Sequence, residues 1–246
     1  MPEEAAVGRP TVVLVHGAAN SSGVWRFWRE RLEAHGCPTR APDLRGHGTA
    51  PCDDLGRVSM ADYVADVQAV AAALPAPPVL VGWSMGGLVA LMYGAVAPTL
   101  GVLALGPSTP GPLLEAPASA PPSPGVFGPE AYGITDVTAP AQPTMPDLDP
   151  EEVGIALASL GPESAFARQE RRRGVWFPPR GVTDSILVAA GERDEIIPPR
   201  ACRRVARFLG ADYVELPGAS HWGLVLNRRA LDAAWPVITA WLDRLH

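Results

Sequence analysis

Residues 79–86, VLVGWSMG, place a serine where an apolar strand gives way to a helix. The aliphatic run at 79–82 predicts a strand buried on both faces, and residues 86–97 predict a helix that ends before Pro98. Ser84 then lies at a sharp strand-to-helix turn between two glycines, which have no side chain to clash with the neighbouring strand and helix. The stretch predicts a nucleophile elbow. The alternative is a tight turn whose serine has no chemical role.

Outward from this turn, short apolar strands alternate with helices along most of the chain. The strands are predicted at residues 11–15, 37–41, 79–82, 101–105, 185–190 and 212–216. The helices are predicted at residues 24–34, 59–74, 86–97, 199–209 and 229–245. Such alternation is typical of a mostly parallel sheet covered by helices on both faces, so the sequence predicts an α/β fold with about six strands.

The alternation stops between residues 107 and 180, which are rich in proline and glycine. Proline cannot donate a hydrogen bond to a sheet, so we expect little sheet here and two helices, at 149–160 and 162–173. A segment this long without strands is typical of a functional lid or of disorder. Trp176 and Phe177 favour a lid, because their large aromatic side chains allow the segment to form a packed structure. The predicted division is 1–106 and 181–246 for the two parts of the α/β core, and 107–180 for an inserted proline-rich lid.

The composition excludes several classes of function. A net charge of −6 offers no overall basic field that would attract nucleic acid. No apolar run reaches the roughly 18 residues of a membrane span, and residues 1–10 do not resemble a secretory signal. The three cysteines lack CxxC spacing and indicate a reducing compartment, so we predict a cytoplasmic protein. All twenty basic residues are arginine, which excludes Schiff-base and P-loop lysine chemistry.

A serine nucleophile needs a base, and His221 is the best candidate. It lies in the loop 218–223 (GASHWG), just after the last predicted strand, although a lone loop histidine can also be an ordinary surface residue. The base in turn needs a carboxylate that fixes its tautomer. Asp194 follows the strand at 185–190, and we favour it over its neighbours Glu192 and Glu195, which are the alternatives.

An acyl-transfer site also needs N–H donors for the oxyanion. We expect one donor to be the backbone N–H of Met85, the residue after the nucleophile. The other is expected to be the backbone N–H of Ala18, in the loop after the first strand. Gly17 lets that backbone approach closely, and His16 is expected to orient the loop by hydrogen bonding.

Aromatic residues are candidates for the walls of an apolar substrate pocket. They are Trp25, Trp83, Trp176, Phe177 and Trp222. Trp83 and Trp222 adjoin the candidate catalytic residues, whereas core or lid packing is the favoured interpretation of the others. The sequence has no His, Cys and Asp cluster with metal-ligand spacing and no glycine-rich phosphate loop, so no metal and no cofactor is predicted.

Five motifs in this order resemble those of the α/β-hydrolase fold superfamily, and the resemblance covers most of the chain. They are residues 15–18 (VHGA), 43–48 (DLRGHG), 82–87 (GWSMGG), 191–194 (GERD) and 218–223 (GASHWG). The resemblance implies the α/β-hydrolase fold, with a triad in the chain order Ser84, Asp194, His221 and a cap over the active site where the alternation stops. The motif at 15–18 followed by Trp25 is similar to the compact branch that holds plant-type methylesterases, hydroxynitrile lyases and small bacterial esterases.

The sequence therefore predicts a serine hydrolase that cleaves a small-molecule carboxylic ester, lactone or thioester through an acyl-enzyme on Ser84. One alternative is a non-hydrolytic enzyme of the same fold, a cyclase, lyase or acyl transferase in a biosynthetic pathway. Another is a ligand receptor with a slow triad. The hydroxynitrile lyases use a lysine beside the catalytic histidine, and its absence argues against cyanohydrin cleavage. The sequence leaves the oligomeric state open.

Overall fold

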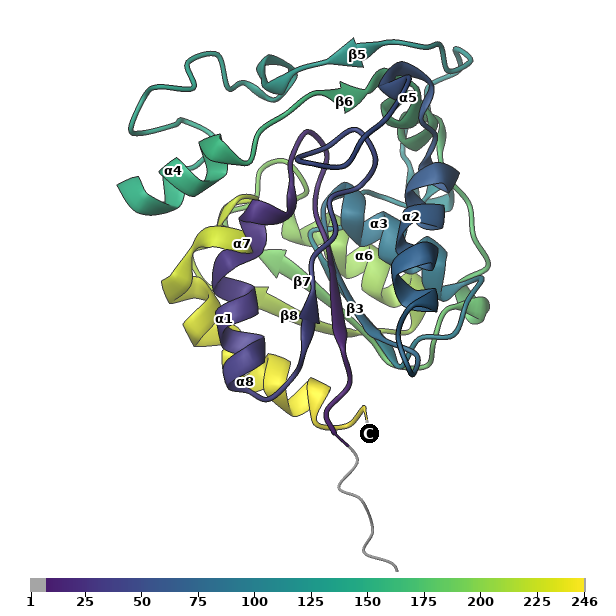
Figure 1. Cartoon of the computed structure of the whole chain (residues 1–246), viewed down its shortest axis with the longest axis vertical. Coiled ribbons are helices and arrows are strands. Elements are labelled where there is room, and N and C mark those ends of the chain that lie inside the picture. Colours follow the sequence, from purple (N-terminus) through teal and green to yellow (C-terminus); the bar gives the residue numbers. More distant parts are fainter. Residues whose placement is uncertain (1–7, 246) are drawn as a thin grey trace, which may run out of the picture.

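Six parallel strands form one sheet in the order β2-β1-β3-β4-β7-β8 (Figure 1). The computed structural model describes residues 8–245. The strands are β1 (Val12–Val15), β2 (Thr39–Arg40), β3 (Val79–Trp83), β4 (Gly101–Leu105), β7 (Ile186–Gly191) and β8 (Asp212–Leu216). This sheet confirms the predicted mostly parallel α/β fold.

Successive side chains of the central strands pack into two apolar cores, one on each face of the sheet. In β1, Val12 and Leu14 join one core and Val13 and Val15 join the other, because side chains alternate along a strand. Helices cover both faces, as predicted (Figure 1). The first core packs under α1 (Arg26–Ala34), α7 (Gly223–Leu226) and α8 (Arg228–Leu242). The second packs under α2 (Met60–Ala72), α3 (Met85–Gly94) and α6 (Pro199–Leu209).

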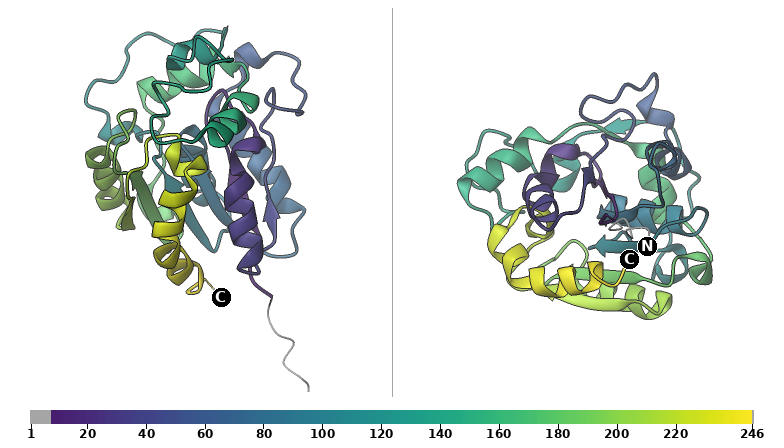
Figure 2. Two further views of the ribbon diagram at one scale, coloured as in Figure 1. Left: turned by 90° about the vertical axis from the view of Figure 1, so that its left-hand side faces the viewer. Right: turned by 60° about the horizontal axis from the view of Figure 1, so that its bottom comes forward.

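Residues 107–180, which we call the insert, lie over the carboxyl ends of the strands (Figures 1 and 2). The insert holds the helices α4 (Pro150–Ala158) and α5 (Ala165–Arg173) and a small antiparallel pair, β5 (Val126–Phe127) with β6 (Glu163–Ser164). Five short 3-10 helices complete the described elements. They are η1 (Ser22–Trp25), η2 (Leu55–Arg57), η3 (Gly111–Leu113), η4 (Pro129–Tyr132) and η5 (Pro179–Gly181).

The helix predicted at 162–173 is wrong at its start. Glu163 and Ser164 are extended and pair with β5, and the helix begins only at Ala165. The Ser164 hydroxyl ends the strand and caps the helix, because it accepts a hydrogen bond from the N–H of Ala167 at 3.1 Å. The Glu163 side chain on this short strand lies between the insert and the core, where it is completely buried.

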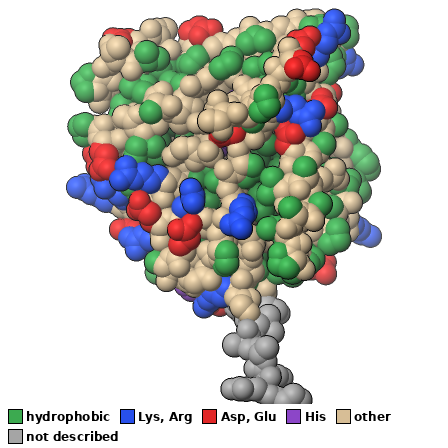
Figure 3. Space-filling model, viewed as in Figure 1, with side chains coloured by type: hydrophobic (Ala, Val, Ile, Leu, Met, Phe, Trp, Pro, Cys, Tyr) green, Lys and Arg blue, Asp and Glu red, His purple; other side chains and the backbone are tan. Residues whose placement is uncertain are grey.

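Basic and acidic side chains lie beside one another on the face drawn in Figure 3, without a large patch of one sign. Basic and acidic side chains of the protein also form ion pairs, for example Arg228 with Asp149 at 2.8 Å. Across residues 8–245, no helix is both long enough and apolar enough to cross a membrane.

Candidate active site

Ser84 occupies the turn between β3 and α3 with a φ of 57° and a ψ of −116°. Among residues 8–245, only Ala19 and Ser84 combine a side chain with a positive φ. Such a conformation costs on the order of 1–3 kcal/mol and is concentrated at functional sites. A Cβ atom at Gly82 would lie 2.2 Å from the carbonyl oxygen of Gly86. A Cβ at Gly86 would lie 2.1 Å from that of Val15, so both glycines are required by packing.

Asp194 and His221 form a buried pair beside this turn. Nδ1 of His221 lies 2.7 Å from Oδ2 of Asp194, and the two residues are only 5% and 2% exposed. The second carboxylate oxygen, Oδ1, accepts hydrogen bonds from the N–H groups of Ile196 (2.9 Å) and Ile197 (2.8 Å). Because the carboxylate accepts the Nδ1 proton, Nε2 of His221 is left as the basic nitrogen.

The acidic alternatives to Asp194 lie elsewhere. Glu192 is exposed and accepts a hydrogen bond from the N–H of Gly218 at 2.7 Å, and Glu195 is exposed as well. Neither has a hydrogen bond to the ring of His221 within the described part of the chain. The backbone of His221 is held from the other side, because Nε1 of Trp83 donates to its carbonyl oxygen at 3.0 Å.

Gly106 lies against the Asp194–His221 pair with a φ of +47°. A Cβ there would lie 3.2 Å from Oδ2 of Asp194 and 3.3 Å from Cε1 of His221. We therefore expect Gly106→Ala to destabilise the fold by about 1–3 kcal/mol and to lower catalytic turnover about tenfold, because the pair must shift. Gly210→Ala is the matched control, since Gly210 has a φ of +66° but no atom within 4 Å of the added Cβ.

Urea unfolding and steady-state kinetics of both variants test this expectation. The control should lose stability through backbone strain, about 1 kcal/mol, and keep its turnover. Equal turnover in Gly106→Ala and the native protein would contradict a role for close packing around the pair.

Ser84 and His221 line the same cavity, which measures about 40 Å³. The cavity wall is mostly apolar. It comprises Ala18, Ala19, Asn20, Trp83, Ser84, Tyr132, Ile134, Leu160, Ile196, His221 and Trp222. Tyr132, Ile134 and Leu160 come from the insert, so the insert forms one wall of the cavity. The end of β3 and the loops that follow β1, β3, β7 and β8 form the rest.

Two of the five predicted pocket aromatics, Trp83 and Trp222, line this cavity, and the other three do not. Trp25 is fully buried in the core, where its ring packs edge-on against Trp28 at 6.0 Å. Trp176 is 65% exposed, and Phe177 is buried in the core on the other face of the sheet. These three side chains lie outside this cavity, and a part for them in a substrate pocket stays a prediction.

The loop after β1 lies directly against the Ser84 turn. A Cβ at Gly17 would lie 2.8 Å from Cε3 of Trp83 and 3.3 Å from Cβ of Ser84. Within residues 8–245, the N–H groups of Ala18 and Met85 donate no hydrogen bond, so both remain available for an oxyanion.

His16 supports this loop from beneath. Its Nε2 accepts from the N–H of Leu44 at 3.0 Å, and its Nδ1 donates to the carbonyl oxygen of Gly17 at 2.8 Å. Burial lowers the pKa of His16 to about 4, so the ring is neutral at pH 7. Both ring nitrogens are used in holding the loop, which agrees with the orienting role expected from the sequence.

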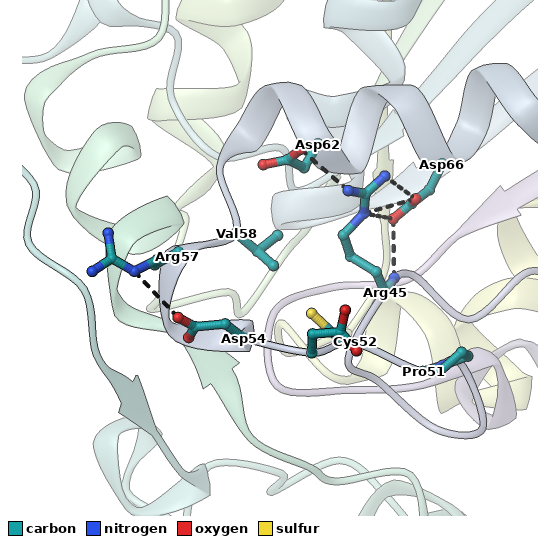
Figure 4. A pocket seen from close by; sticks show the side chains of 9 residues that line it. Arg45, Pro51, Cys52, Asp54, Arg57, Val58, Asp62 and Asp66 are labelled. Carbon is teal, nitrogen blue, oxygen red and sulfur yellow. Dashed lines mark hydrogen bonds and ion pairs between the residues drawn. The ribbon is translucent and has the colours of Figure 1, made fainter.

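A larger hollow of about 510 Å³ lies beside the start of α2, and Figure 4 shows it from close by. Arg45 crosses it to pair with Asp66 at 2.7 Å and Asp62 at 3.2 Å. Neither Ser84 nor His221 lines this hollow. In residues 8–245, no three His, Cys, Asp or Glu side chains are grouped so that they could hold a metal ion. We therefore place the candidate site at Ser84.

Comparison with known proteins gives one family and several relatives. The model of the alpha/beta hydrolase family matches residues 12–234. A pimeloyl-[acyl-carrier protein] methyl ester esterase from Xanthomonas campestris pv. campestris is 43% identical over 101 residues, which are 41% of this chain and 38% of that protein. The match thus spans less than two fifths of that relative's length.

Two solved structures share the fold over nearly the whole chain. A thermophilic esterase from Thermogutta terrifontis has a TM-score of 0.74 at 23% identity, covering 97% of this chain and 92% of the other. A methylesterase from Arabidopsis has a TM-score of 0.72 at 18% identity, covering 94% and 99%. At such low identity the two structures establish the fold alone.

Proposed function

The chain belongs to the alpha/beta hydrolase family, and we propose that it hydrolyses a small-molecule carboxylic ester, lactone or thioester through an acyl-enzyme on Ser84. One observation carries the proposal. His221, which is joined to the buried carboxylate of Asp194 at 2.7 Å, lines the same cavity as a serine in strained backbone geometry. Strain of this kind persists where function requires it, and the pair supplies the base that a serine nucleophile needs.

In the proposed reaction, Oγ of Ser84 attacks the substrate carbonyl carbon while Nε2 of His221 takes the hydroxyl proton. Asp194 stabilises the imidazolium that forms. The N–H groups of Ala18 and Met85 bind the oxygen on which negative charge develops. The imidazolium then protonates the leaving alcohol or thiol. A water molecule, deprotonated by His221, then attacks the carbonyl carbon of the acyl-enzyme. The imidazolium returns that proton to Oγ of Ser84 as the acid leaves, so the net reaction is ester plus water to acid plus alcohol.

We further propose that the insert acts as a lid. It contributes Tyr132, Ile134 and Leu160 to the cavity beside Ser84. The cavity measures about 40 Å³, whereas sites for drug-sized ligands occupy about 300–1,000 Å³. A substrate with more than a few heavy atoms therefore requires the insert to move, and the apolar wall favours an apolar group next to the scissile bond.

Methyl esters are the first substrates to test, because the relative from Xanthomonas is a methyl ester esterase. The panel contains methyl, p-nitrophenyl and thiophenyl esters of short acids and one lactone, each assayed by acid release in a pH-stat. We expect the native protein to release acid from at least one ester and Ser84→Ala to release none above background. Acid release that survives in Ser84→Ala, or a panel without turnover by the folded native protein, would overturn the proposal and favour non-hydrolytic chemistry.

A further inference from the structure

Glu163 is a buried carboxylate that joins the insert to the core. Its Oε1 accepts hydrogen bonds from the hydroxyl of Tyr63 at 2.6 Å and from the N–H of Ser164 at 2.8 Å. Its Oε2 accepts from the N–H of Ala19 at 3.1 Å and lies 3.4 Å from Nε2 of His47. The side chains of Glu163 and His47 are both completely buried, so water does not weaken their attraction.

Charge and burial shift the pKa of each member of this pair in opposite directions. Burial raises the pKa of Glu163, but His47, Arg171 and the Tyr63 hydroxyl outweigh it and bring that pKa to about 2. Burial lowers the pKa of His47, and the neighbouring carboxylate outweighs that effect and raises it. Glu163 is therefore an anion at neutral pH, and an anion is a strong acceptor for a backbone N–H.

The insert holds both backbone groups of Ala19. Glu163 accepts from its N–H, and the N–H of Gly161 donates to its carbonyl oxygen at 3.0 Å. The hydroxyl of Ser159 lies 2.9 Å from Oδ1 of Asn20 and 2.7 Å from the carbonyl oxygen of Ala156, and it can donate its one hydrogen to either. Nδ2 of Asn20 donates to the carbonyl oxygen of Ala18 at 3.1 Å. Three contacts from the insert thus converge on the loop that carries the Ala18 N–H.

Ala19 needs such support because its φ is +56°. A residue with a side chain relaxes from that conformation unless its surroundings determine it. A relaxed Ala19 would rotate the adjoining peptide and move the Ala18 amide relative to Ser84. A misplacement of about 1 Å can reduce the rate about a hundredfold.

We propose that Glu163 is a positioning residue that holds the oxyanion loop, residues 18–20, against Ser84 through the N–H of Ala19. The inference rests on the proposed function. It means that the oxyanion hole is complete only while the β6 end of the insert is seated on the core, so the proposed lid also prepares the site for chemistry.

The test compares Glu163→Ala with Glu163→Gln and with Glu152→Ala. Gln keeps an oxygen that can accept from Ala19. Glu152 is the matched control, since it is 4% exposed, lies in the insert, and accepts from the N–H groups of Asp149 (2.9 Å) and Arg228 (3.0 Å). It thus joins the insert to the core away from the oxyanion loop.

Two rates are measured for each variant. The first is kcat, with KM, for an ester that the native protein hydrolyses. The second is the rate constant for phosphonylation of Ser84 by a fluorophosphonate, which also places a negative oxygen in the oxyanion hole. We expect Glu163→Ala to lower both rates about 10- to 100-fold while KM changes less than about threefold. Glu163→Gln should recover most of the loss, and Glu152→Ala should stay within about threefold of the native rates.

A Glu163→Ala variant that is no slower than Glu152→Ala, or that changes only KM, would overturn the inference. If Glu163→Ala does not fold by circular dichroism, Glu163→Asp decides, because the shorter side chain withdraws the carboxylate from the N–H of Ala19. A roughly three- to tenfold loss of kcat at unchanged KM supports the inference, and an unchanged kcat overturns it. A folded native protein that neither reacts with the fluorophosphonate nor hydrolyses any ester would instead contradict the proposed function.

Discussion

Removing Ser84 or His221 is expected to lower kcat about 10⁶-fold, and removing both should cost no more. The reason is that neither group works alone, since the serine is a poor nucleophile without a base and the base has nothing to activate without the serine. The measurement is kcat on the best ester for Ser84→Ala, His221→Ala and the double variant.

His35→Ala is a suitable control for the histidine substitution. His35 lies at the end of α1 and pairs with Asp243 at 2.9 Å, far from the cavity wall. Its kcat should stay within about twofold of the native value. A double variant much slower than both singles would show that Ser84 and His221 act independently, and the proposed mechanism would then fail.

The second large effect is expected for Asp194→Asn, which should lower kcat about 10⁴-fold. An asparagine can still accept hydrogen bonds from Ile196 and Ile197, so the loop keeps its shape. Its NH₂ group would then face Nδ1 of His221, where the native carboxylate lies at 2.7 Å, and would favour the tautomer whose proton is on Nε2. That tautomer cannot take the proton of Ser84.

Glu192→Gln tests whether the effect belongs to Asp194 alone. Glu192 was an alternative partner from the sequence, and in the structure it binds the N–H of Gly218. Its substitution should change kcat by less than about threefold. A loss of kcat below tenfold in Asp194→Asn, or an equal loss in Glu192→Gln, would show that Asp194 is not the functional partner of His221.

The fold of the core was predictable because its signals are local. Residues 12–15 and 79–81 are aliphatic at every position, which fits strands buried on both faces. The helix expected at 199–209 is α6 with the same bounds. The glycines around Ser84 were also informative, since each contacts backbone atoms that leave no room for a side chain. The pairing of Asp194 with His221 followed from their positions after successive strands, β7 and β8, whose carboxyl ends meet at one edge.

The insert was harder to predict because its contacts are distant in the sequence. Glu163 binds Ala19 across 144 residues and Tyr63 across 100, and it lay inside an expected helix, so no local pattern marked it. Tyr132 lines the cavity from a stretch for which no element was predicted, and Leu160 lines it from the end of the helix expected at 149–160. Nothing local in the sequence marks either residue as part of a cavity. The short helix α7 was missed because four residues are too few to establish a period.

The most direct test of the account is the intact mass of the protein after treatment with a fluorophosphonate. In this reaction Oγ of Ser84 forms a bond to phosphorus, fluoride leaves, and His221 takes the hydroxyl proton. The account predicts one adduct on the native protein, with the mass of the reagent less hydrogen fluoride, and none on folded Ser84→Ala or His221→Ala. An adduct that persists on Ser84→Ala, or a folded native protein without any adduct, would contradict the claim that His221 activates Ser84.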